Sequence, residues 1–71
     1  MTVALHAAEQ AFELLSDLYT DVHKYLAPDE DEVWVSNLVE AGIRCAHLAA
    51  LEGDVRSAEY WADWVASVVT D

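Results

Sequence analysis

The sequence has few basic residues, and this shortage limits what the protein can bind. Only 3 of its 71 residues are Lys or Arg, against 14 Asp and Glu, so the formal net charge is −11 at pH 7. Neutralising nucleic-acid phosphates requires clustered basic side chains, and so does docking on an anionic membrane surface. The composition therefore argues against direct binding to either and directs attention to basic partners.

Cysteine and long apolar segments are also scarce. The single cysteine, Cys45, cannot form an internal disulfide. No apolar run approaches the length of a membrane span, about 20 residues, because charged residues such as Glu40 and Arg44 interrupt the longest ones. No cationic segment with an apolar core follows Met1. We therefore expect a soluble protein located in the cytoplasm.

Hydrophobic residues make up 55% of the chain, which excludes disorder, and their spacing is helical. Apolar side chains recur at steps of three and four residues, and no segment alternates as a half-buried strand does. The spacing predicts helices over about residues 2–26, 30–52 and 54–70, within a single helical domain over residues 1–71. The short connections predict an all-α fold, a small antiparallel three-helix bundle.

Local signals predict where the first two helices begin and end. Thr2 is a suitable N-cap for the first helix, and Pro28 ends it because proline disfavours the helical conformation in the residue before it. Asp29 is the predicted N-cap of the second helix, with Glu32 at the third position in an approximate capping box.

Residues 46–65 resemble the helix–Gly-Asp–helix turn of tetratricopeptide-type hairpins. Small residues precede Gly53 and Asp54, Ala58 lies five residues after the glycine, and aromatic residues follow. The pattern occurs once, whereas a solenoid needs about three repeats to bury its faces. We interpret it as a local turn, with Gly53 in the left-handed position after one helix and Asp54 as the N-cap of the next.

Four carboxylates stand four residues apart in the first predicted helix: Glu9, Glu13, Asp17 and Asp21. Neighbours at this spacing repel one another by about 0.2–0.5 kcal/mol per pair. A lysine at position 17 would turn two of these repulsions into attractions, so its absence indicates a stripe kept for binding. We predict that the stripe docks on a basic surface of a nucleic-acid-binding protein. The alternative is a solvated acidic face with no binding role.

Other carboxylates and some aromatic residues extend this prediction. Glu59 and Asp63 repeat the four-residue spacing, and residues 29–32 add four acidic side chains. Trp61 lies on the apolar stripe of the third helix, whereas Trp34 and Trp64 are either core residues or binding anchors. The predicted partner-binding residues are Glu9, Glu13, Asp17, Asp21, Asp29, Glu30, Asp31, Glu32, Glu59, Asp63 and Trp64.

The chain is short and acidic, it has Trp and Tyr residues among its charges, and its segments at residues 56–59 and 62–64 have a similar character. In these features it resembles the small helical inhibitors encoded by phages, in particular the anti-CRISPR proteins. That class has no shared motif, so no residue role is carried over from it. The resemblance implies inhibition of a CRISPR effector complex, with a type I surveillance complex as the first expectation, by blocking access to target DNA in the cytoplasm of a bacterial host. The alternative is an antitoxin-like or adaptor-like interaction module that uses exposed aromatic residues, for which a homodimer is a suitable state.

The sequence contains no complete motif for metal binding or catalysis. An EF-hand loop beginning at Asp29 would place Val33 and Trp34 where an oxygen ligand and the turn glycine are needed. The three histidines lack zinc-binding spacing, and Cys45 is expected to be a buried apolar residue. With no nucleophile–base pattern and no phosphate-binding loop, we expect no enzyme, no metal and no cofactor.

Overall fold

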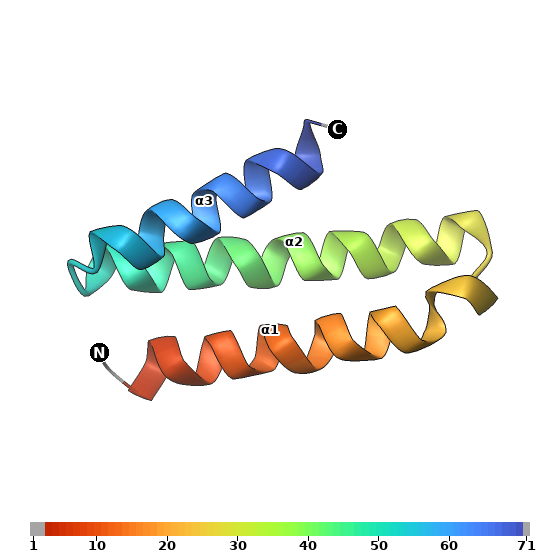
Figure 1. Ribbon diagram of the computed structural model, residues 1–71, viewed down its shortest axis with the longest axis horizontal. Coiled ribbons are helices and arrows are strands. Elements are labelled where there is room, and N and C mark those ends of the chain that lie inside the picture. The colour runs from red at the N-terminus through yellow and green to blue at the C-terminus, as the bar shows by residue number, and fades with distance from the viewer. Residues whose placement is uncertain (1–2, 71) are drawn as a thin grey trace.

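The computed structural model describes residues 3–70, which form three α-helices and one short 3₁₀ helix. The helices are α1 (Val3–Val22), η1 (His23–Tyr25), α2 (Pro28–Leu51) and α3 (Val55–Val69). Successive α-helices run antiparallel (Figure 1). The predicted all-α three-helix bundle is confirmed. The predicted N-cap, Thr2, lies outside the described residues.

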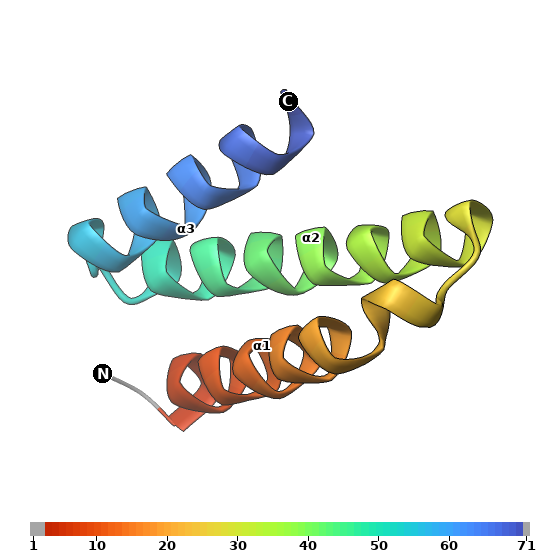
Figure 2. The same cartoon turned by 45° about the vertical axis from the view of Figure 1, so that its right-hand side comes forward.

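The bundle is flat. α2 lies between α1 and α3 in both views, and the C-terminal end of α3 is farther from α2 than its beginning (Figures 1 and 2). The Cα atoms extend over 39 × 25 × 13 Å. No helix within residues 3–70 is both long and apolar enough to cross a bilayer.

The connection between α1 and α2 differs from the prediction. α1 ends at Val22 and tightens into η1, and α2 begins at Pro28, two residues earlier than expected. Proline suits the first helical position because its fixed φ is helical and its missing N–H is not needed there. Ala27 is therefore the N-cap instead of Asp29, and its backbone N–H donates to the Glu30 carboxylate at 2.9 Å.

The connection between α2 and α3 is as predicted. Gly53 has a φ of 75°, and its N–H donates to the Ala50 carbonyl oxygen at 3.1 Å. The Asp54 N–H donates to the Ala49 carbonyl oxygen at 2.9 Å, which completes a Schellman motif. Asp54 then caps α3 by accepting from the backbone N–H of Ser57 at 3.1 Å and from its hydroxyl at 2.9 Å.

The capping bonds of Asp54 make part of the stability dependent on pH. The Ser57 backbone and hydroxyl donors lower the pKa of Asp54 below its ordinary value of 3.8. The stabilisation is therefore present above pH 3.8 and is lost as the pH falls through the lowered pKa. We expect Asp54→Asn to melt at a lower temperature than the parent at pH 7, because the charged acceptor is gone, and the difference to shrink at about pH 3.

Thermal unfolding at both pH values checks this expectation. Asp63→Asn is a matched control, since Asp63 is exposed on α3 and its substitution removes the same charge without removing a cap. It should raise the melting temperature at pH 7 by reducing self-repulsion. An Asp54→Asn protein that melts with or above the parent at pH 7 would contradict the capping role.

The fully covered core is small. Its buried residues are Leu5, Leu38, Gly42, Cys45, Ala49 and Trp61. The ring of Phe12 joins α1 to α3 because it meets Trp61 edge-on at 4.7 Å between centroids and Trp64 at 4.8 Å. A domain this small buries only about 60% of the surface that its unfolded chain exposes, so these aromatic contacts are a large share of its stability.

Gly42 marks the closest approach of α2 and α3. A Cβ atom at this position would lie 2.9 Å from Cζ3 of Trp64 and 3.1 Å from Cγ2 of Val65. Glycine inside a helix is less favourable than alanine by about 1 kcal/mol. The presence of glycine at position 42 is explained by the indole ring of Trp64, which packs directly over it.

Candidate protein-interaction surface

The four carboxylates of α1 follow a winding path. Four residues turn an α-helix through about 400°, so each carboxylate is displaced by about 40° from the one before it. Glu13, Asp17 and Asp21 are exposed, whereas Glu9 is half-buried at the side that meets α3. Glu9 Oε2 accepts a hydrogen bond from Nε1 of Trp61 at 3.0 Å. One end of the predicted stripe, Glu9, therefore faces inward and has a structural role.

Two of the four carboxylates in residues 29–32 also have structural partners. Glu30 accepts from the Ala27 backbone, as described above, and Oδ1 of Asp31 accepts from the hydroxyl of Tyr19 at 2.5 Å. This hydrogen bond raises the pKa of Tyr19, and burial and the charge of Asp31 add to the shift. Asp31 and Glu30 hold the α1–α2 connection together, and Asp29 and Glu32 are the exposed pair that remains for a partner.

The tryptophans whose location the sequence left open are both half-buried. Trp64 packs on Phe12 and over Gly42, and Trp34 lies 6.2 Å from the Tyr19 ring between centroids. Both rings are occupied in helix packing. Trp64 therefore offers a partner only part of its surface, which limits the predicted anchoring role.

The exposed aromatic residues are tyrosines that the sequence analysis did not single out. Tyr25 is 77% exposed and Tyr60 is 63% exposed. Tyr60 lies on α3 beside the exposed carboxylates Glu59 and Asp63. Tyr60 lies one position before Trp61 of the apolar stripe, and this offset was the available signal for its exposure.

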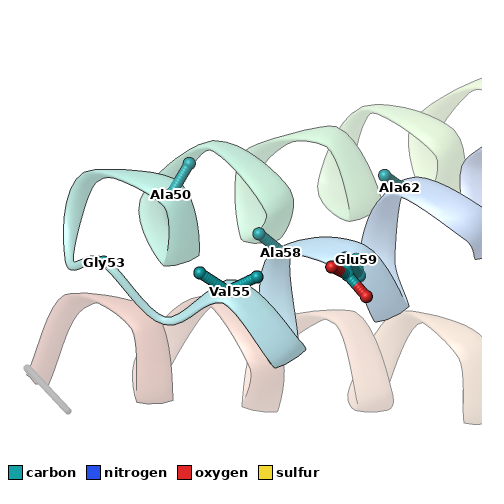
Figure 3. A pocket seen from close by; sticks show the side chains of 6 residues that line it. All are labelled: Ala50, Gly53, Val55, Ala58, Glu59 and Ala62. Atoms are coloured by element: carbon teal, nitrogen blue, oxygen red, sulfur yellow. The ribbon is translucent and has the colours of Figure 1, made fainter.

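A shallow apolar groove, the alanine groove, runs between α2 and α3. Two cavities of about 400 and 370 Å³ form it and share Ala62. Figure 3 shows Ala50 on α2 and Ala58 and Ala62 on α3 along the groove, with Glu59 at its edge. Alanine side chains are too short to fill the space between the helices, so the groove stays open to solvent.

A separate cavity between α1 and α3, the α1/α3 cavity, has a different chemistry. Its volume is about 290 Å³, and it is lined by Glu9, Phe12, Glu13, Tyr60 and Trp61. Three aromatic rings thus meet two carboxylates of one helix face. The predicted partner-binding residues Glu9 and Glu13 are brought together here, whereas Asp17 and Asp21 lie farther along α1.

Cys45 is fully buried, as predicted. Burial raises the pKa of its thiol, and the negative charge of Glu9 raises it further. The thiol is therefore protonated at neutral pH and weakly nucleophilic. Within residues 3–70, no three His, Cys, Asp or Glu side chains are placed to hold a metal ion.

No family model, curated protein or solved structure matches this chain. The chemistry of the surface is therefore the basis for assigning a function.

Proposed function

We propose that this protein is an acidic interaction module that binds a basic surface of a partner protein and competes with nucleic acid for it. One observation carries the proposal: exposed carboxylates are present on all three α-helices. Those of the predicted set that have no role in capping or helix packing are Glu13, Asp17 and Asp21 on α1, Asp29 and Glu32 on α2, and Glu59 and Asp63 on α3. Within residues 3–70, none of the seven forms an ion pair with a Lys or Arg side chain.

The size and spacing of these charges suit a surface that ordinarily holds nucleic acid. The long axis of 39 Å is comparable with one turn of a DNA duplex, about 34–36 Å. Carboxylates four residues apart rise about 6 Å along a helix, so α1 alone has about half the charge density of one DNA strand. Carboxylates from more than one helix are needed to approach that of a duplex.

The resemblance to anti-CRISPR proteins gives the proposal a first target. On this hypothesis the partner is a CRISPR effector complex, with type I surveillance complexes tested first, and bound protein blocks target DNA. The mechanism requires no catalysis. Long-range attraction between opposite charges would accelerate the encounter and make it sensitive to salt.

The alanine groove supports an alternative, an antitoxin-like or adaptor-like module whose interface is apolar. Ile43, Val55 and Val69 are exposed along the groove and add to its apolar surface. Salt distinguishes the two hypotheses. Screening weakens attraction between exposed charges, whereas it has little effect on apolar contacts.

Reversing one charge on α1 tests the proposed function. We expect Asp17→Lys to weaken inhibition of target-DNA binding by a type I surveillance complex by about tenfold, because it places a cation on the docking face. Its stability should be equal or higher, since the new lysine is one turn from both Glu13 and Asp21. The measurement is a competition binding assay at about 50 mM and 200 mM salt, with inhibition weaker at the higher concentration.

Glu40→Lys is the matched control. It changes the net charge by the same amount at an exposed position of α2 that is outside the predicted partner-binding set. It should leave inhibition close to that of the parent. Equal losses in the two variants would contradict docking through the predicted partner-binding residues, and inhibition that is insensitive to salt would favour the apolar alternative.

A further inference from the structure

The α1/α3 cavity has walls that are held in place. Trp61 is 5% exposed, and its ring meets Phe12 at 4.7 Å and Tyr60 at 5.1 Å between centroids, both edge-on. Its Nε1–H donates to Glu9, which fixes that carboxylate at the mouth of the cavity. The Tyr60 ring, which is largely exposed, forms the outer wall.

The carboxylates in this cavity have more hydrogen-bond acceptor sites than the protein fills with its own donors. An ionised carboxylate has about four lone-pair sites. The Trp61 Nε1–H occupies one site on Glu9, and no Lys or Arg side chain within residues 3–70 forms an ion pair with Glu9 or Glu13. The cavity thus combines negative charge, spare acceptors and aromatic faces, which together attract a cation that can also stack.

We propose that the α1/α3 cavity binds an arginine side chain of the partner protein, with the guanidinium group between Glu9 and Glu13 and against the Tyr60 ring. A guanidinium is planar, has five N–H donors and stacks on aromatic rings, whereas a lysine ammonium is a compact and more strongly hydrated charge. This inference rests on the proposed function, since it names the residue type that the basic partner inserts.

Two other occupants fit the cavity less well. A metal ion would find only two carboxylates, and the other lining side chains are aromatic rings, one of which carries a hydroxyl. A second copy of this chain would bring a formal charge of −11 and only three Lys or Arg residues in all. Repulsion between the two copies opposes that arrangement, and an arginine from a basic partner meets no such repulsion.

The indole Nε1–H of Trp61 reports on this cavity directly. We propose a titration with N-acetyl-arginine amide, followed by two-dimensional ¹⁵N–¹H NMR, in which Trp34→Phe and Trp64→Phe identify the other two indole signals. The Trp61 signal should shift and saturate. N-acetyl-citrulline amide, which has nearly the same shape and no charge, should produce no comparable shift.

Charge-matched variants test whether the cavity itself is responsible. Glu13→Gln should weaken binding of the arginine amide by about fivefold, as expected for a partly exposed ion pair. Glu40→Gln removes an equal charge from an exposed position of α2 that does not line the cavity, and it should leave the affinity unchanged. Tyr60→Leu should also weaken binding by removing the aromatic face. Both altered positions near the cavity are exposed, so the variants should fold.

The outcomes separate this proposal from the proposed function. An equal response to arginine and citrulline amides, or equal weakening in Glu13→Gln and Glu40→Gln, would overturn the arginine site. If surveillance-complex inhibition is observed without a Trp61 shift, the docking function holds and the arginine site is wrong. If arginine binds selectively but no inhibition occurs, the site holds and the CRISPR target is wrong.

Discussion

We expect the Trp61→Ala protein to be largely unfolded at room temperature, so that heating produces no cooperative unfolding transition. Trp61 is the largest buried side chain and contacts Phe12 and Tyr60. Replacing a buried Phe or Trp by Ala costs about 3–5 kcal/mol. A core of this size supplies about 3–5 kcal/mol in all, so a single substitution removes most of the margin.

Circular dichroism on heating and the dispersion of the NMR spectrum measure this effect. Trp61→Phe is the informative companion, because it keeps an aromatic ring against Phe12 while removing the donor to Glu9. We expect it to remain folded with a lower melting temperature. A Trp61→Ala protein that melts cooperatively within a few degrees of the parent would show that the aromatic cluster is not the centre of stability.

Gly42→Ala is expected to destabilise the protein, although alanine is the better helix former by about 1 kcal/mol. The added methyl group would lie 2.9 Å from the Trp64 ring, and that ring is held in place by Phe12. Overpacking of this kind costs about 1–3 kcal/mol. The net effect on the free energy of unfolding should therefore be a loss, measured by urea denaturation.

Two further variants test the cause of that loss. Ser36→Ala, at an exposed position of the same helix, should raise stability slightly, as helix propensity alone predicts. In a Trp64→Phe background the smaller ring gives the methyl group room, so Gly42→Ala should cost less there than in the parent. A gain in stability from Gly42→Ala in the parent would contradict the proposed close contact.

The elements of the fold were predictable because they depend on local chemistry. Helical spacing identified all three helices, and the Gly53–Asp54 turn followed from the conformations that these two residues favour. The start of α2 was not predicted because Pro28 carries two opposite signals: it disfavours continuation of one helix and favours the first position of the next. Sequence alone does not say which signal governs.

The candidate site was less predictable because it depends on which helices become neighbours. The spacing of Glu9 and Glu13 correctly placed them one turn apart, but their contact with Tyr60 and Trp61 comes from a helix more than 40 residues later in the chain. Trp64 was ambiguous for the same reason, since its burial depends on Gly42 and Phe12 in the other helices. The alanine groove gave no sequence signal because alanine is common in helices of every environment.

The Cα atoms of the bundle span only 13 Å along its shortest axis, and under the proposed function this thinness has a consequence for the lifetime of the protein in a cell. A partner that covers one broad face of so thin a bundle would bury apolar surface that the chain cannot bury by itself. Binding and folding would then be linked equilibria. A partner present at 100 times its dissociation constant adds about 2.7 kcal/mol. This gain approaches the entire stability of an isolated domain of this size, about 3–5 kcal/mol. Released protein would then unfold more often and be degraded faster, so its abundance would follow that of its partner.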